Sequence, residues 1–147
     1  MSGLMIGDIA VQRIIEEEVP FFVPHETFVE ATPEALAPHR YWLDPNARDP
    51  ETGMLILPFQ SYLVRTKHHT ILIDTCIGCG KSITHRPQWF QRTDQTWLNN
   101  LRAAGLQPKA IDYVFCTHLH ADHCGWNTIF MDGRWVPTFP NAKYIIS

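Results

Sequence analysis

The sequence predicts a mixed α/β fold, and two observations carry this prediction. The apolar runs Thr70–Asp74 and Ile111–Cys116 are typical of strands, and between them Thr93–Ala104 has apolar residues at helical spacing. A strand–helix–strand unit of this kind places both strands in one sheet. In addition, a histidine-rich stretch directly follows the second strand, at the sheet edge where open α/β folds usually place their chemistry.

The N-terminal region is predicted to open with a strand over Ile6–Ile15, whose solvent end is marked by Glu16–Glu18. Pro20 and Pro24 interrupt the next stretch, so we expect no long regular element from Val19 to Phe28. Three aromatic residues in this stretch are predicted to be buried: Phe21, Phe22 and Phe28.

The middle of the chain shows clear start and stop signals. Thr32-Pro33 begins a short helix, with threonine as cap and proline in the first turn. A polar loop over Asp44–Gly53 precedes a strand from Met54 to Arg65, and Lys67–His69 forms a solvated turn. The main helix is predicted to begin with Thr93 as its cap and to end at Gly105. Its expected buried face consists of Trp97, Leu98, Leu101 and Ala104.

Composition excludes several classes of protein. The chain has 147 residues and a net charge of −3, which favours neither nucleic acid nor an anionic membrane surface as a partner. The N-terminus carries Glu16–Glu18 where a signal peptide needs an apolar core, and no apolar run approaches the ~20 residues of a membrane span. We expect a soluble cytoplasmic protein.

The stretch Thr117–Gly125 contains His118, His120, Asp122 and His123 in the pattern His-x-His-x-Asp-His. Imidazole and carboxylate ligands suit zinc, manganese and iron, and a set without thiolates suits catalysis better than a closed structural site. Isolated core histidines are the ordinary alternative. With this composition, however, chance produces the pattern with a probability on the order of one in a thousand.

Thr117–His123 resembles the signature of the metallo-β-lactamase-fold superfamily, as do the strand ending in Asp74 and the residues Gly125-Trp126-Asn127. The stretch from 132 to 144 is similar to its lactonase-like and organophosphate-hydrolase-like branch. The resemblance implies an αββα sandwich of two similar halves. Residues 1–147 would then be a single domain covering the first half of a longer hydrolase, because the chain stops within the predicted strand Tyr144–Ile146.

The resemblance also implies roles for individual residues. His118 and His120 would bind a first metal ion, and Asp122 and His123 a second. A complete site would hold two Zn²⁺, with manganese or iron as alternatives, and further ligands would come from later in the chain. Asp122 would also accept a proton during catalysis. Asp74 would brace the loop without binding metal itself.

The expected activity is hydrolysis of an ester, lactone or related bond in a small molecule by a metal-bound hydroxide. One alternative is an oxidoreductase on the same fold, since fold does not determine function. Another is a non-catalytic fragment that binds metal incompletely. The motif is specific to the superfamily and not to one substrate.

The cysteines offer a competing interpretation. Cys76-Ile77-Gly78-Cys79 is a C-x-x-C motif, but a zinc ribbon requires a second such pair, and Cys116 and Cys124 are too far apart to supply one. Gly78 and Gly80 favour a loop over the helix that a thioredoxin-like motif opens. We therefore expect thiols without a metal role, with Cys124 lining the site.

Half a sandwich leaves apolar surface uncovered. Trp97, Trp126, Trp135 and the strand Tyr144–Ile146 are expected to form an exposed patch and an unpaired edge. The sequence therefore predicts a homo-oligomer or association with a C-terminal half.

Overall fold

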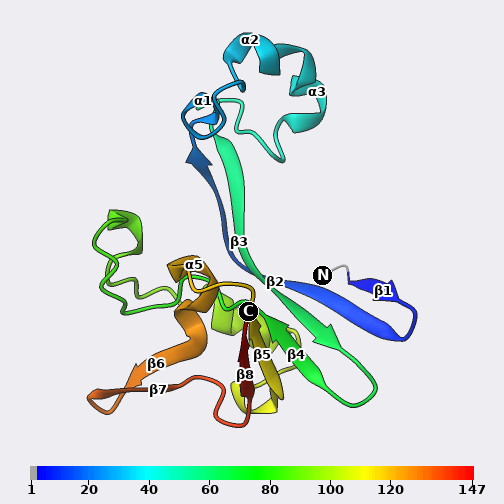
Figure 1. Cartoon of the computed structure of the whole chain (residues 1–147), viewed down its shortest axis with the longest axis vertical. Coiled ribbons are helices and arrows are strands. Elements are labelled where there is room, and N and C mark those ends of the chain that lie inside the picture. The colour runs from blue at the N-terminus through cyan, green and yellow to red at the C-terminus, as the bar shows by residue number, and fades with distance from the viewer. Residues whose placement is uncertain (1–2) are drawn as a thin grey trace. The chain divides into compact units, whose positions relative to one another are not determined.

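The computed structural model describes residues 3–147 and divides the chain into two compact units (Figure 1). The larger unit comprises the N-terminal residues up to Glu17 together with Phe59–Ser147. The smaller unit is Glu18–Pro58. All of the residues predicted to bind or brace a metal belong to the larger unit.

A six-stranded mixed sheet contains most of the strands, in the order β1-β2-β3-β4-β5-β8. Two adjacent pairings, β1–β2 and β3–β4, are antiparallel, whereas β4, β5 and β8 run parallel to one another. Two further strands, β6 and β7, form a separate antiparallel hairpin. The strands are β1 Leu4–Ile6, β2 Ile9–Phe22, β3 Leu55–Arg65, β4 Thr70–Ile73, β5 Tyr113–Cys116, β6 Thr128–Met131, β7 Arg134–Pro137 and β8 Lys143–Ile146. This mixed α/β architecture is the predicted fold class, and the expected strand–helix–strand unit is confirmed.

Helix α4, Thr96–Ala103, connects the parallel strands β4 and β5 and buries Trp97, Leu98 and Leu101, as predicted. Its start was predicted wrongly, because Thr93 does not cap it. Instead, the Asp94 carboxylate accepts hydrogen bonds from the Thr96 amide at 2.9 Å and from the Thr96 hydroxyl at 2.7 Å. An ionised acceptor satisfies a free helical N–H better than a hydroxyl does, so the first turn forms after Asp94.

The core of the larger unit lies around this helix. Trp97 stacks on Trp126 with ring centroids 5.8 Å apart, and Phe139 packs edge-on against Trp97 at 6.0 Å. All three side chains are fully buried, so the expectation that Trp97 and Trp126 are exposed is wrong. The helix and the segments after β5 cover them from within the chain. Trp135 and the strand residues Tyr144, Ile145 and Ile146 are exposed, as expected.

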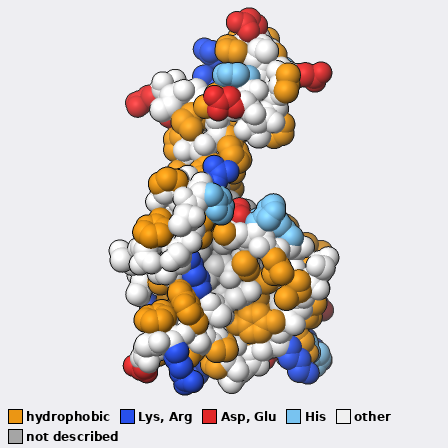
Figure 2. All heavy atoms as spheres, turned by 60° about the vertical axis from the view of Figure 1, so that its left-hand side comes forward, with side chains coloured by type: hydrophobic (Ala, Val, Ile, Leu, Met, Phe, Trp, Pro, Cys, Tyr) orange, Lys and Arg blue, Asp and Glu red, His pale blue; other side chains and the backbone are white. Residues whose placement is uncertain are grey.

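Hydrophobic side chains also reach the surface in other places (Figure 2). On the β6–β7 hairpin, Phe130 is 55% exposed and Met131 51%. No helix within residues 3–147 has the length and apolar character needed to cross a membrane.

Strand β2 corrects the prediction for the N-terminal region. It continues through Glu16–Glu18 and Pro20 to Phe22, and the Glu16 side chain is only 3% exposed. Proline is tolerated because, within residues 3–147, β1 pairs only with Ile9–Val11 and leaves that side of β2 without a strand at Pro20. Glu16 was misread as a solvent marker because the run of three glutamates hides the alternation of the strand. Ile14 and Glu16 share the buried face.

The helices of the smaller unit are all short: α1 Pro24–Thr27, α2 Pro33–Leu36, η1 Ala37–His39 and α3 Arg40–Leu43. Thr32 caps α2 as predicted, since its hydroxyl accepts a hydrogen bond from the Ala35 amide at 3.2 Å. Phe21 and Phe22 pack edge to face at 4.8 Å. Phe28 is 59% exposed, so its predicted burial is wrong. A unit this small has too little interior to enclose all its aromatic residues.

Candidate metal centre

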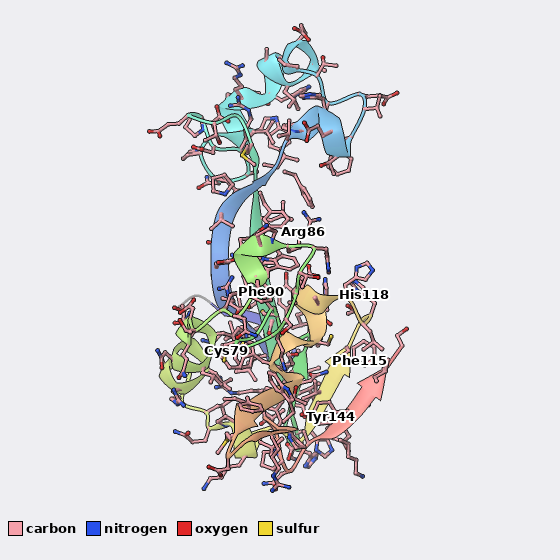
Figure 3. The ribbon with its side chains drawn as sticks, turned by 90° about the vertical axis from the view of Figure 1, so that its left-hand side faces the viewer. Cys79, Arg86, Phe90, Phe115, His118 and Tyr144 are labelled. Atoms are coloured by element: carbon pink, nitrogen blue, oxygen red, sulfur yellow. The ribbon has the colours of Figure 1, made fainter. Side chains whose placement is uncertain are left out.

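The histidine-rich loop, Thr117–Cys124, begins where β5 ends. Its second half forms a single helical turn, α5 (Ala121–Cys124), and η4 (Gly125–Asn127) follows. In Figure 3, His118 lies beyond the carboxyl end of β5, past Phe115. Because β4 runs parallel to β5, Asp74, which directly follows β4, lies at the same sheet edge. The strand topology thus brings together residues more than forty positions apart in sequence.

Asp74 ties the end of β4 to the start of the loop. Its carboxylate accepts hydrogen bonds from the Thr117 amide at 2.8 Å and from the Thr117 hydroxyl at 2.8 Å. Its other contact is with the ring of His123, at 2.8 Å from Nδ1. The side chain is almost fully buried, and its backbone adopts a φ of 57°. Asp74 thus contacts both the first residue of the loop and the ring of His123.

The contact with Asp74 orients His123. When Nδ1 donates its proton to a carboxylate, the lone pair of the imidazole is left on Nε2. That nitrogen lies 3.5 Å from Oδ2 of Asp122. A nitrogen donor and a carboxylate oxygen therefore face the same small volume, as two neighbouring metal ligands would.

The other two histidines lie beside this pair. The ring centroid of His118 is 3.9 Å from that of His123 and 4.6 Å from that of His120. The Thr117 hydroxyl lies 3.1 Å from His118 Nδ1 and so connects Asp74 to this ring as well. Both His118 and His120 are exposed, so a metal ion and a small molecule have access to them.

These donors suit a divalent ion, but they supply only part of a coordination sphere. Three imidazoles and a carboxylate are the donor types that zinc takes in catalytic sites, and Asp74 provides the usual carboxylate partner of a ligating histidine. Among the described residues, however, no three or more His, Cys, Asp or Glu side chains converge on one point as a metal site. The four predicted ligands are thus brought together at one edge without closing a site.

Two other histidines of the larger unit lie at the far end of β4. His68 and His69 are exposed in the turn between β3 and β4, at the opposite end of β4 from Asp74. His69 packs against Tyr113 with ring centroids 5.1 Å apart. This agrees with the prediction of a solvated turn.

The four cysteines are free, and burial raises the pKa of each thiol. Cys76 is fully buried and contacts the Ser61 hydroxyl at 3.4 Å. Cys124 lies within the loop, where its thiol donates to the His120 carbonyl at 3.3 Å. Cys124 therefore shapes the loop as a hydrogen-bond donor.

Two features near the loop escaped the sequence analysis. Glu16 accepts hydrogen bonds from the Ile77 amide at 2.7 Å and from the Trp126 indole at 3.0 Å. Gly125 lies so close to the preceding loop that a Cβ atom there would sit 1.9 Å from the Ile77 carbonyl oxygen. The alternation of Ile14 and Glu16 along β2 could have predicted the burial of Glu16. No local sequence pattern predicts the close approach of Gly125 to Ile77.

A comparison with protein-family models matches residues 58–146 to the metallo-beta-lactamase superfamily. The chain belongs to this superfamily. The region from β3 to β8 that carries the candidate metal centre is thus the region that defines the family, and the predicted resemblance is confirmed.

Curated relatives of this superfamily match a shorter stretch. An N-acyl homoserine lactonase from Bacillus cereus is 30% identical over 90 residues, which cover 53% of this chain and 35% of the relative. An N-acyl homoserine lactonase from Bacillus thuringiensis is 30% identical over 89 residues, covering 52% and 35%. The match therefore spans about a third of the length of these relatives.

Solved superfamily structures match nearly the whole chain. The hydrolase AbOPH is 25% identical with a TM-score of 0.62, and the match covers 97% of this chain and 42% of that one. A probable metal-dependent hydrolase from Staphylococcus aureus is 26% identical with a TM-score of 0.66, covering 96% and 47%. AidC, a dizinc quorum-quenching lactonase, shares the fold at 20% identity with a TM-score of 0.67, covering 97% and 43%. The metallo-β-lactamase fold is thereby confirmed for this chain, which corresponds to less than half of each structure.

Proposed function

We propose that this chain carries part of the metal centre of a metal-dependent hydrolase that cleaves ester or lactone bonds in small molecules, with zinc as the metal. One observation carries the proposal. Asp74 holds His123 through Nδ1 at 2.8 Å and turns Nε2 towards Asp122. A buried carboxylate that orients an imidazole in this way is the usual support of a metal-ligating histidine. A merely structural histidine has no need of a second carboxylate at its other nitrogen.

The residues divide into three roles. The imidazoles of His118, His120 and His123 and the carboxylate of Asp122 are assigned as metal ligands. Asp74 orients the loop. A divalent ion at such a site supplies Lewis acidity and lowers the pKa of a water molecule. Asp122 is also assigned to accept a proton during bond cleavage, since its carboxylate is partly exposed beside His123.

The remaining ligands are assigned to residues outside this sequence, either in a longer chain or in an associated one. Two observations support this assignment. The four donors present do not close a metal site within residues 3–147. The compared hydrolase structures are also more than twice as long as the part that this chain matches.

Cyclic esters are the substrate class to test first, because the curated relatives are named N-acyl homoserine lactonases. Opening a lactone adds water across the acyl C–O bond, and the alkoxide that leaves must receive a proton. A proton accepted from water by Asp122 is available for that leaving oxygen. No further residue of this chain is assigned to the substrate.

Zinc uptake provides the test. The purified chain is expected to bind Zn²⁺ with fewer than two tightly held ions per chain, and His118→Ala combined with His120→Ala should abolish that binding. His68→Ala combined with His69→Ala is the matched control, because it removes two exposed histidines at the other end of β4. Unchanged zinc uptake in the first double variant would contradict the proposal. A longer form of the protein should in addition open an acyl homoserine lactone, and lose this activity in the first double variant only.

A further inference from the structure

Two chain segments run side by side where the histidine-rich loop ends. One is Thr75–Ile77, which follows Asp74, and the other is His123–Asn127, which begins with the last two residues of the loop. The Thr75 amide donates to the His123 carbonyl at 2.8 Å, and the Trp126 amide donates to the Thr75 carbonyl at 2.9 Å. Between them, the Gly125 amide donates to the Cys76 carbonyl at 2.7 Å. The backbone of His123 is therefore held by the pairing of these two segments.

Glu16, on β2, contacts both segments with one carboxylate. Its Oε2 accepts the Ile77 amide at 2.7 Å, and its Oε1 accepts the Trp126 indole N–H at 3.0 Å. We propose that Glu16 is a positioning residue that clamps the two segments together and thereby fixes the orientation of His123 in the histidine-rich loop. The consequence for metal binding rests on the function proposed above, whereas the clamp itself does not.

The clamp requires a carboxylate. Both partners are N–H donors, so the side chain between them must accept at both of its ends, and an amide has only one acceptor oxygen. Its NH₂ group would face one of the two donors and leave it unsatisfied in the interior. Trp126 has no room to turn away, because it is fully buried and stacked on Trp97 at 5.8 Å. A glutamine in place of Glu16 must therefore lose one of the two contacts.

The surroundings of Glu16 place its pKa within a range of pH that can be measured on the folded chain. Burial, opposed by the Ile77 amide, Arg92 and the Trp126 indole, raises its pKa to about 7. The other titratable groups that interact with it are Glu17 on the same strand and the thiols of Cys76 and Cys79. The Arg92 guanidinium is shared with Glu17 at 2.8 Å and with Asp94 at 3.4 Å, so it does not neutralise Glu16 alone. The clamp is complete when Glu16 is ionised, since a protonated carboxyl must place its own hydrogen near the two donors.

The experiment compares Glu16→Gln with Glu17→Gln at pH 8. Glu17 is the matched control, because it is the next residue on β2, carries the same charge and also contacts Arg92. In Glu16→Gln, we expect amide hydrogen exchange at Ile77 and Gly125 to accelerate at least ~10-fold. Zn²⁺ affinity should fall by ~10–100-fold, the range typical of a partner that orients a metal ligand. Glu17→Gln should change neither.

A second measurement needs no variant and so remains informative if Glu16→Gln does not fold. In the wild-type chain, the NMR resonance of the Trp126 indole proton should shift with a midpoint near pH 7. Unchanged exchange at Gly125 in Glu16→Gln, or an indole resonance without inflection between about pH 3 and 9, a range that includes both 4.5 and 7, would overturn the clamp. A wild-type chain that takes up no Zn²⁺ would instead overturn the proposed function, and the exchange measurements would still decide the clamp.

Discussion

Histidines lie at both ends of the parallel strand pair β4–β5, but their surroundings differ. At the carboxyl end, His118, His120 and His123 gather beside Asp122, and a buried Asp74 holds His123 at 2.8 Å. At the amino end, His68 and His69 are exposed in a turn. The acid at this end, Asp112, accepts a backbone amide, that of Thr70, at 2.8 Å. The presence of histidines therefore does not identify the candidate metal centre. What distinguishes the carboxyl end is a buried carboxylate in contact with an imidazole ring.

The largest expected effect tests the ligands at the two ends. His123→Ala should weaken Zn²⁺ binding by more than ~100-fold, because it removes a donor that Asp74 has already oriented. His69→Ala should leave the affinity unchanged, since this ring packs against Tyr113 and His68 and faces solvent. Isothermal titration with Zn²⁺ measures both. Equal losses in the two variants would mean that binding is non-specific.

The second prediction compares the two carboxylates. Asp74→Asn should lower Zn²⁺ affinity by ~10–100-fold while leaving the number of ions bound at saturation unchanged. Asp112→Asn, at the other end, should change neither quantity. Competition with a chelator followed by elemental analysis separates affinity from stoichiometry. If Asp74→Asn loses a whole metal equivalent at saturation, Asp74 is itself a ligand and the bracing role is wrong.

The third prediction compares a glycine from each end. Gly125→Ala should destabilise the fold by about 3 kcal/mol, because its Cβ would sit 1.9 Å from the backbone oxygen of Ile77. Gly105, after α4, has no atom within 4 Å of such a Cβ. Gly105→Ala should therefore cost only about 1 kcal/mol, from its φ of 81°. Urea denaturation gives both values. A smaller loss of stability in Gly125→Ala than in Gly105→Ala would show that Gly125 does not lie against the backbone of Ile77.

The smallest effect concerns pH. Because burial raises the pKa of Glu16 from 4.5 to about 7, the folded chain binds this proton more tightly than the unfolded chain does. The stability that this group contributes is fully present below pH 4.5 and is lost as the pH rises towards 7. One proton limits the slope to ~1.4 kcal/mol per pH unit. Subtracting the stability profile of Glu16→Gln from that of the wild type should isolate this slope, and Glu17→Gln should not reproduce it.

The residues at the carboxyl ends of β4 and β5 could be predicted from the sequence. The packing of Glu16 and Trp126 against the segments that follow these strands could not. The ligand motif, the preceding strand and Asp74 are each encoded by short local patterns, and parallel pairing then places them at one edge. Glu16 lies about 110 positions from Trp126, so its role depends on a contact that no local pattern encodes. Its two glutamate neighbours also made it resemble a solvated run. The burial of Trp126 escaped prediction for the same reason, since its cover comes from Trp97 on α4.

X-ray absorption at the zinc edge of the Zn²⁺-loaded chain tests the central claim most directly. If the carboxyl end of β5 is the metal centre, the first shell should contain only nitrogen and oxygen at ~2.0–2.2 Å, together with the outer-shell scattering of imidazole rings. That imidazole signal should disappear in His118→Ala combined with His120→Ala. A sulfur shell at ~2.3 Å would place the zinc on the cysteines instead and would contradict the account.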